Sequence, residues 1–433
     1  GAEKVMVVTD RVIGASQGFQ GILKGLEEDG IDYQVYDQVV PEPPVETVDA
    51  AADSLKKIGY GMVIAVGGGS SIDTSKAICA LATNEGSARD YLFGGSRTLT
   101  HRPLPLVAVP TTAGSGSEVT AASVLSDEQR GIKLSITHDW LIPLVAVVDP
   151  IMHRDMPRII TASTGMDALT HAVEAYVSTF ATEYTNGMCR DATKMVFDYL
   201  PRAYYSAFRD AKPDPVAREK MANASALAGI AFANAFLGIN HSLSHKLGGW
   251  FHIPHGTANA LLFPFVCRFN AQRHPYKMGT FSQYKYPQAF ERYVELGELI
   301  GVKGKTDEQT FENWIKACEQ LKKDIDIPET ILDWLLEAHP EKTAEEWEAE
   351  FLAAVDQMSE WAFHDACTGC NPVYPTIAEL KGCYLKAFYG EKKYAEKYGD
   401  IWEVPVTLPT DTHAAYPMGL CADLGVEKTG GFN

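Results

Sequence analysis

Short apolar runs alternate with helical patterns over the first 155 residues, and this alternation restricts the possible folds more than any other feature. Five runs have the composition of β-strands: residues 5–10, 33–38, 62–69, 105–112 and 144–150. Helical spacing covers the intervening residues 17–28, 46–58 and 70–83. Strands that alternate with helices build a parallel sheet covered by helices. The chain is therefore predicted to begin with an α/β domain.

Strand patterns end near residue 157, and helical spacing follows. Helices are predicted over residues 163–179, 186–200, 216–238, 240–248, 288–300, 307–323, 345–364 and 376–388. Just before this change, residues 123–137 have the pattern of a hairpin that turns at Arg130-Gly131. We expect an α/β domain over residues 1–156 and an all-helical domain over residues 157–433, with a tail from about residue 392.

The composition disfavours several classes of partner and compartment. The net charge of −18 argues against nucleic acid and anionic membranes, because both are bound by clustered lysine and arginine. No stretch reaches the roughly 18 apolar residues of a membrane span. The eight cysteines are scattered, as is typical of a reduced, cytoplasmic protein. Gly1–Glu3 lead into an apolar strand pattern without a signal peptide, which we interpret as a loss of upstream residues.

Two glycine-rich loops follow predicted strands: GGGSSID (67–73) and PTTAGSGSE (110–118). Glycine lets the backbone approach a ligand closely, and the free N–H groups at a helix start bind phosphate. The first loop does not match Gly-x-Gly-x-x-Gly, because Ile72 stands at the sixth position, so a plain tight turn is the alternative. Two such loops at the carboxyl ends of parallel strands favour a nucleotide site.

Four of the 12 histidines fall within NHSLSHKLGGWFHIPHG (240–256). They are His241, His245, His252 and His255. A solvated loop is one explanation, but apolar stretches lie on both sides, and an unpaired buried polar group costs about 1–3 kcal/mol. Metal ligation would satisfy such groups. His241 and His245 are four residues apart and share a helix face, so one can bind metal while the other works beside it. His252 is the alternative ligand.

A second candidate pair lies earlier in the chain. Asp167 and His171 are four residues apart on a predicted helix and share a face. Such a pair is usually a surface ion pair, but here it lies among Ala, Leu and Val. One carboxylate with three imidazoles suits Fe²⁺ or Zn²⁺ rather than Ca²⁺ or Mg²⁺. The candidate ligand set is Asp167, His171, His241 and His255.

The motifs GGGSSID, PTTAGSGSE, GMDALTHAVEAY and HSLSHKLGGWFHIPHGTANA together resemble the iron-containing (group III) alcohol dehydrogenases, over about residues 4–390. GIAFANAFLG, FSQYKYPQA and CTGCNPVYP are most similar to the alcohol dehydrogenase half of bifunctional aldehyde–alcohol dehydrogenases. The resemblance implies an N-terminal dinucleotide-binding α/β domain and an all-helical metal-binding domain, an architecture shared with dehydroquinate synthase. It implies NAD, Fe²⁺ or Zn²⁺, small aldehydes and primary alcohols as substrates, and a homodimer or larger homo-oligomer. The alternatives are a reductase of another small functionalised aldehyde, a dehydroquinate-synthase-like lyase and a filament-forming subunit.

The resemblance also implies roles for individual residues. His245 becomes a proton relay beside the metal, which leaves His252 as a residue that packs near the site. Asp10 would hold the adenosine ribose and exclude the 2′-phosphate of NADP. The residues implied to bind pyrophosphate are Gly68, Gly69 and Ser70. The residues implied to line the cofactor cleft are Asp73, Thr111, Thr112, Ser115, Val124 and Lys133. The residues implied to border the substrate are Ala122, Phe232 and Cys367.

Overall fold

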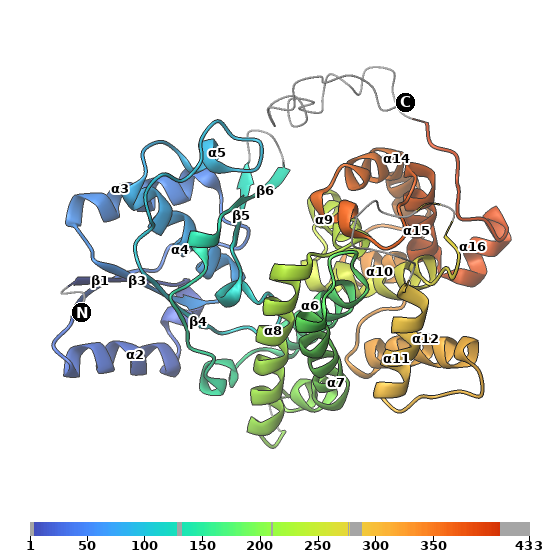
Figure 1. Cartoon of the computed structure of the whole chain (residues 1–433), viewed down its shortest axis with the longest axis horizontal. Coiled ribbons are helices and arrows are strands. Elements are labelled where there is room, and N and C mark those ends of the chain that lie inside the picture. The colour runs from blue at the N-terminus through green and yellow to red at the C-terminus, as the bar shows by residue number, and fades with distance from the viewer. Residues whose placement is uncertain (1–3, 128–131, 209–210, 276, 278–287, 408–433) are drawn as a thin grey trace. The chain divides into compact units, whose positions relative to one another are not determined.

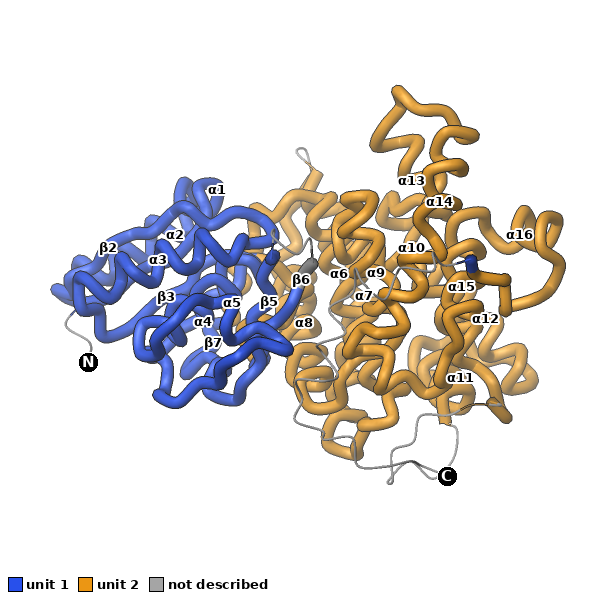
Figure 2. Tube along the Cα trace, turned by 90° about the horizontal axis from the view of Figure 1, so that it is seen from above, with its two compact units in different colours: residues 1–111, 120–147, 407–433 blue, residues 112–119, 148–406 orange. Residues whose placement is uncertain are grey.

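The computed structural model describes residues 4–127, 132–208, 211–275, 277 and 288–407. The chain forms two compact units (Figure 2). Unit 1 comprises residues 1–111, 120–147 and 407–433, and unit 2 comprises residues 112–119 and 148–406. The second glycine-rich loop is therefore divided between the two units.

A five-stranded sheet forms the centre of unit 1. All neighbouring strands pair in parallel, in the order β2-β1-β3-β4-β7. The strands are β1 (Lys4–Val8), β2 (Asp32–Tyr36), β3 (Met62–Gly67), β4 (Leu106–Pro110) and β7 (Val145–Ala146). Helices cover both faces, α2 (Gln17–Glu28) on one side and α3 (Val45–Ile58) with α4 (Gly69–Thr83) on the other (Figure 1). Because both faces are covered, the central strands are mostly buried and read as continuous apolar runs. The predicted α/β fold is confirmed.

The rest of unit 1 is a hairpin and short helices. β5 (Ala122–Asp127) and β6 (Ile132–Thr137) pair in antiparallel fashion, as the sequence predicts. The expected turn at Arg130-Gly131 lies outside the described residues. The short helices are α1 (Arg11–Gly14), α5 (Ala88–Tyr91) and η2 (Asp139–Leu141).

Every regular element that the structure describes in unit 2 is helical. The helices of eight or more residues are α6 (Arg158–Val177), α7 (Glu183–Tyr205), α8 (Pro215–Ala235), α9 (Ile239–Phe251), α10 (His255–Asn270), α11 (Ala289–Leu299), α12 (Asp307–Asp324), α13 (Ile331–Ala338), α14 (Ala344–Phe363), α15 (Ile377–Tyr389) and α16 (Glu391–Tyr398). The shorter turns are η1 (Ser117–Val119), η3 (Pro150–His153) and η4 (Ala366–Cys370). Helix α6 packs against α7, α8 and α10, and nearly all of its side chains from Thr161 onward are buried, because apolar residues lie around the whole helix.

Three helices of unit 2 have no counterpart among the predicted elements. Helix α10 contains Pro264, which interrupts a helical pattern because proline lacks the backbone N–H. Helix α13 is only eight residues long, and α16 is mostly charged, so neither has a strong periodic signal. These omissions follow from weak local signals rather than from a wrong fold class.

Among the described residues, no single helix is long and apolar enough to cross a membrane. One bent pair, Pro215–Ala235 with Ile239–Phe251, meets that test by length and composition, with an angle of 108° between its helices.

Gly256, the second residue of α10, lies directly against the backbone of α6. A Cβ at this position would lie 2.0 Å from the carbonyl oxygen of Ser163. Gly256→Ala is therefore expected to lower the free energy of unfolding by about 1–3 kcal/mol, measured by chemical denaturation. The control is Gly187→Ala in α7, where a Cβ would meet nothing within 4 Å and stability should stay equal or rise by up to about 1 kcal/mol. Equal stability of the two variants would contradict the close approach.

Candidate metal centre

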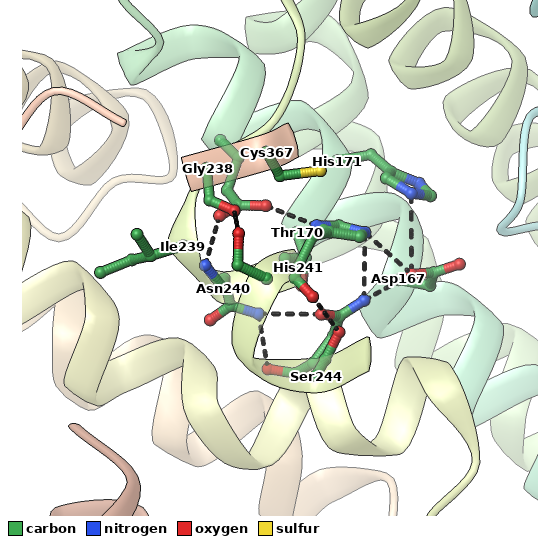
Figure 3. A network of polar contacts seen from close by, with 12 residues as sticks. Asp167, Thr170, His171, Gly238, Ile239, Asn240, His241, Ser244 and Cys367 are labelled. Atoms are coloured by element: carbon green, nitrogen blue, oxygen red, sulfur yellow. Dashed lines mark hydrogen bonds and ion pairs between the residues drawn. The ribbon is translucent and has the colours of Figure 1, made fainter. Parts of the chain in front are cut away.

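Three helices of unit 2 bring four candidate ligands together. Asp167 and His171 lie one turn apart on α6, His241 lies on α9, and His255 begins α10. One ligand atom from each residue lies within 4.8 Å of all the others. Oδ1 of Asp167 is 3.8, 3.7 and 3.6 Å from Nε2 of the three imidazoles, in chain order. Figure 3 shows Asp167, His171 and His241 converging on one another.

This spacing fits a divalent transition-metal ion. Ligands about 2.1 Å from a tetrahedral ion stand roughly 3.4 Å apart. The separations of 3.6–3.8 Å are slightly wider. A set of one carboxylate and three imidazoles is also the donor chemistry that iron and zinc accept.

Burial and mutual charge shape the electrostatics of this group. Burial alone would favour the neutral acid, but the surrounding histidines lower the pKa of Asp167 below its ordinary value. Burial lowers the pKa of His171 to about 4, so this ring is neutral. Burial acts the same way on His241, but the carboxylates of Glu174 and Asp167 outweigh it and raise the pKa of His241 to about 9. The group thus combines an ionised carboxylate with imidazole rings that differ in pKa.

Glu174 orients His241 and also supports the start of α9. Its Oε2 accepts from Nδ1 of His241, and its Oε1 accepts the backbone N–H of Asn240 at 2.7 Å. Gly238, the residue before α9, has no side chain that could cap the helix. A Cβ at Gly238 would lie 3.0 Å from Oε1 of Glu174 and 2.6 Å from Oδ1 of Asn371. The glycine therefore leaves room for two distant side chains to cap α9 in its place.

Two further contacts fix the remaining ligand atoms. Nδ2 of Asn259 donates to Oδ1 of Asp167 at 2.8 Å and lies 3.2 Å from Nε2 of His241. Nδ1 of His171 lies 3.1 Å from the carbonyl oxygen of Gly114, which leaves Nε2 to face the cluster. The His171 ring also stacks on Phe232, with centroids 4.3 Å apart.

The other two histidines of the motif differ in their surroundings. His245 stacks on His255, with ring centroids 5.4 Å apart and planes at 14°, so it lies beside the cluster. His252 ends α9 in the left-handed conformation, with φ 53°, and it is exposed. The expectation that His252 packs near the site is therefore wrong, because a helix terminus directs it to solvent.

The candidate pyrophosphate residues lie where β3 meets α4. Gly68 precedes α4 without a side-chain cap, and Gly69 and Ser70 form the first turn. Gly67 is required there, because a Cβ would lie 2.3 Å from Oγ of Ser71. The same Cβ position is 3.8 Å from Oδ2 of Asp10, so that side chain reaches the loop. Oδ1 of Asp10 is already used, because it caps α1 by accepting two backbone N–H groups.

The remaining candidates divide between the units. In unit 1, Oδ2 of Asp73 accepts the backbone N–H of Val124 at 3.0 Å, and the N–H of Thr111 donates to the carbonyl of Gly67. Ala122 is also in unit 1, and its carbonyl accepts from the buried Lys76. In unit 2 are Thr112, Ser115, Phe232 and Cys367. The side chain of Lys133 lies outside the described residues.

Cys367 lies in η4, beside the polar network of the cluster (Figure 3). Burial raises the pKa of its thiol well above the ordinary value, with the nearby carboxylate of Asp365 acting in the same direction. Cys367 is therefore a neutral thiol.

Sequence reasoning missed three residues that contact the cluster or His245: Glu174, Asn259 and Asp365. Glu174 follows Asp167 by seven residues, so its position on the same helical face could have identified it. Asn259 follows His255 by four residues, but the start of α10 was not predicted. Nothing local indicates Asp365, which is 120 positions from its partner His245.

Comparisons with known proteins agree with this arrangement. Two protein-family models match the chain. The family described as iron-containing alcohol dehydrogenase matches residues 1–150. The family described as Fe-containing alcohol dehydrogenase, C-terminal, matches residues 161–388. The bifunctional aldehyde-alcohol dehydrogenase AdhE of Escherichia coli (strain K12) is 38% identical over 92% of this chain. The chain spans only 44% of the length of that relative.

Two further similarities cover nearly whole proteins. The NADPH-dependent butanol dehydrogenase of Clostridium saccharobutylicum is 36% identical, over 85% of this chain and 87% of the relative. A crystal structure of a 1,3-propanediol oxidoreductase has a TM-score of 0.78 and 33% identity, over 90% of this chain and 93% of the other. The chain belongs to the iron-containing alcohol dehydrogenase family.

Proposed function

We propose that this protein is a metal-dependent, NAD(H)-linked alcohol dehydrogenase that interconverts small aldehydes and primary alcohols. The observation that carries the proposal is the convergence of the four ligand atoms, with His245 beside them. Asp167, His171, His241 and His255 would hold the metal, for which we propose Fe²⁺, with Zn²⁺ as the alternative. Such an ion supplies Lewis acidity toward a carbonyl group, and a nicotinamide supplies or accepts the hydride.

The chain's own residues would orient the reactants and move the proton. The side chain of His245 is 34% exposed, so it can exchange protons with solvent, and in the proposed reaction it would stand next to the reacting oxygen. Phe232 and Cys367 would form apolar walls of the substrate pocket, and Ala122 stays a prediction. Gly68, Gly69 and Ser70 would bind the pyrophosphate of the cofactor through backbone and hydroxyl groups. Asp73, Thr111, Thr112, Ser115, Val124 and Lys133 stay predictions for the cofactor cleft.

The compartment and assembly are also proposals. All cysteines of the described residues are free, which supports the predicted cytoplasmic location. The predicted homo-oligomer stays a prediction.

The test of the proposed function is NADH oxidation, followed by absorbance, with a panel of small aldehydes. Metal-loaded protein should turn over at least one of them, and chelation followed by Fe²⁺ should remove and restore that activity. Absence of turnover with every aldehyde and with both NADH and NADPH would overturn the proposal.

Alanine variants of the two histidines on α9 should separate ligand from relay. His241→Ala should lose the metal, because it removes one of four ligands. His245→Ala should keep the metal and NADH binding while kcat falls by about 10²–10⁴-fold, the usual contribution of a general acid–base group. Elemental analysis and steady-state kinetics measure both. A metal-free His245→Ala with a metal-loaded His241→Ala would reverse the two roles.

Asp10 should make the protein prefer NADH. Its carboxylate can accept hydrogen bonds from the ribose hydroxyls and repels a 2′-phosphate. Asp10→Gly should increase kcat/KM for NADPH relative to NADH. Glycine is also a tolerated N-cap that costs only a few tenths of a kcal/mol, so helix α1 should survive.

The control is Asp32→Ala, which removes an exposed acidic side chain at the start of β2, the opposite end of that strand, and should not change the cofactor preference. The name of the butanol dehydrogenase relative refers to NADPH, so the outcome matters within this family. A wild-type preference for NADPH would contradict the role of Asp10.

Glu174→Gln should weaken metal affinity by about 10–100-fold, because the amide cannot hold His241 as a carboxylate does. Its remaining oxygen can still accept from Asn240, so helix α9 should form. The control is Glu295→Gln on α11. Its carboxylate accepts from Tyr176, which lies on α6 as Glu174 does. Metal titration against a chelator should show a loss in the first variant and none in the second. Equal affinities would remove Glu174 from the metal site.

A further inference from the structure

Asp365 joins three polar groups at a single carboxylate. It directly precedes η4, and its side chain is only 11% exposed. Its Oδ2 lies 2.9 Å from Nδ1 of His245 and 2.8 Å from Nζ of Lys246. Its Oδ1 accepts the backbone N–H of Cys367 at 3.0 Å. This carboxylate therefore links α9 to the turn that carries a candidate substrate-pocket residue.

These contacts determine which nitrogen of His245 carries a proton in the neutral ring. Lys246 and His245 hold the pKa of Asp365 well below its ordinary value, although burial opposes this. An ionised carboxylate can only accept hydrogen bonds. Nδ1 of His245 must then donate, which leaves the lone pair on Nε2.

The ring of His245 is also restricted in orientation. Asp365 binds one edge, and the His255 ring stacks almost parallel on its face, at 14°. With the edge and the face both occupied, the ring keeps one rotamer, and Nε2 is the nitrogen available to a reactant. Lys246 neutralises the carboxylate that the ring contacts.

We propose that Asp365 is a positioning residue that fixes the tautomer and orientation of His245, and so prepares Nε2 for proton exchange with the substrate. The inference rests on the function proposed above. In alcohol oxidation, a bound oxidised nicotinamide would accept the hydride from the carbon, and Nε2 of His245 would accept the hydroxyl proton, directly or through water. The products are an aldehyde, the reduced nicotinamide and a protonated His245, which returns its proton to solvent. Aldehyde reduction runs through the same transfers in reverse.

The test is Asp365→Asn, which keeps the size of the side chain and an oxygen for the N–H of Cys367. With its oxygen kept on the N–H of Cys367, the amide places its nitrogen where Oδ2 was. This nitrogen would donate to Nδ1 of His245, so the ring would carry its proton on the wrong nitrogen, and Nζ of Lys246 would lose its acceptor and turn to solvent. We expect kcat to fall by about tenfold or more, as tautomer reversal does in other histidine-dependent enzymes. Metal content and KM for aldehyde and NADH should change by less than about twofold. Loss of the metal or of cooperative unfolding would assign Asp365 to the fold instead and overturn the proposal.

A double variant separates positioning from a general structural effect. In a His245→Ala background, Asp365→Asn should lower kcat by less than about twofold, because residues that act as a unit are not additive. An undiminished loss in that background would overturn the proposal. If His245→Ala is slow but Asp365→Asn keeps normal kcat, the inference fails while the proposed function stands. If His245→Ala keeps normal kcat, the proposed relay itself fails.

Asp149→Asn is the matched control. Asp149 caps η3 in the way that Asp365 caps η4, by accepting the N–H two residues ahead at 2.9 Å. No histidine ring contacts its carboxylate in the part of the chain that the structure describes. Its kcat should stay within about twofold of wild type, and a loss equal to that of Asp365→Asn would attribute the effect to capping.

Discussion

The buried carboxylate of Asp167 is the constraint on which the helical unit depends. A charged group in the middle of an apolar helix is costly unless hydrogen bonds and opposite charges surround it. Asp167 is only 5% exposed and lies on α6, where nearly all side chains from Thr161 onward are buried. Helices α9 and α10 must therefore bring polar groups close to α6, and Gly256 permits that approach. The polar groups that compensate the buried carboxylate thus also form a set of ligand atoms suited to a metal ion.

The polar groups around this carboxylate form a chain of hydrogen bonds. Asn259 donates to it, and Asn240 in turn donates to Asn259. Glu174 holds His241 from the opposite side. Because Asp167, His171 and His241 are each held by a second group, these three ligands keep their arrangement through hydrogen bonds that are internal to the chain.

The sequence predicts those features that follow from local periodicity. The parallel sheet, helix α2 and the pairing of Asp167 with His171 depend on spacings of two, three or four residues, which are visible without tertiary structure. Helix α10 is not predicted, because Pro264 interrupts its periodic pattern. The role of Asp365 is not predicted for a different reason. Its partner His245 is brought close only by the packing of α9 against η4, which no local signal encodes.

Helix α9 has a consequence for how such a site can change. It carries His241 and His245 one turn apart, so their relative direction is set by the 3.6-residue repeat of the helix. A single inserted residue between them would rotate one side chain by about 100° around the helix axis and separate it from the other. In the proposed function, the binding of the metal and the movement of the proton would thus be coupled by backbone geometry. Variation in substrate range would then have to come from residues on other elements, such as the proposed pocket residues Phe232 on α8 and Cys367 in η4.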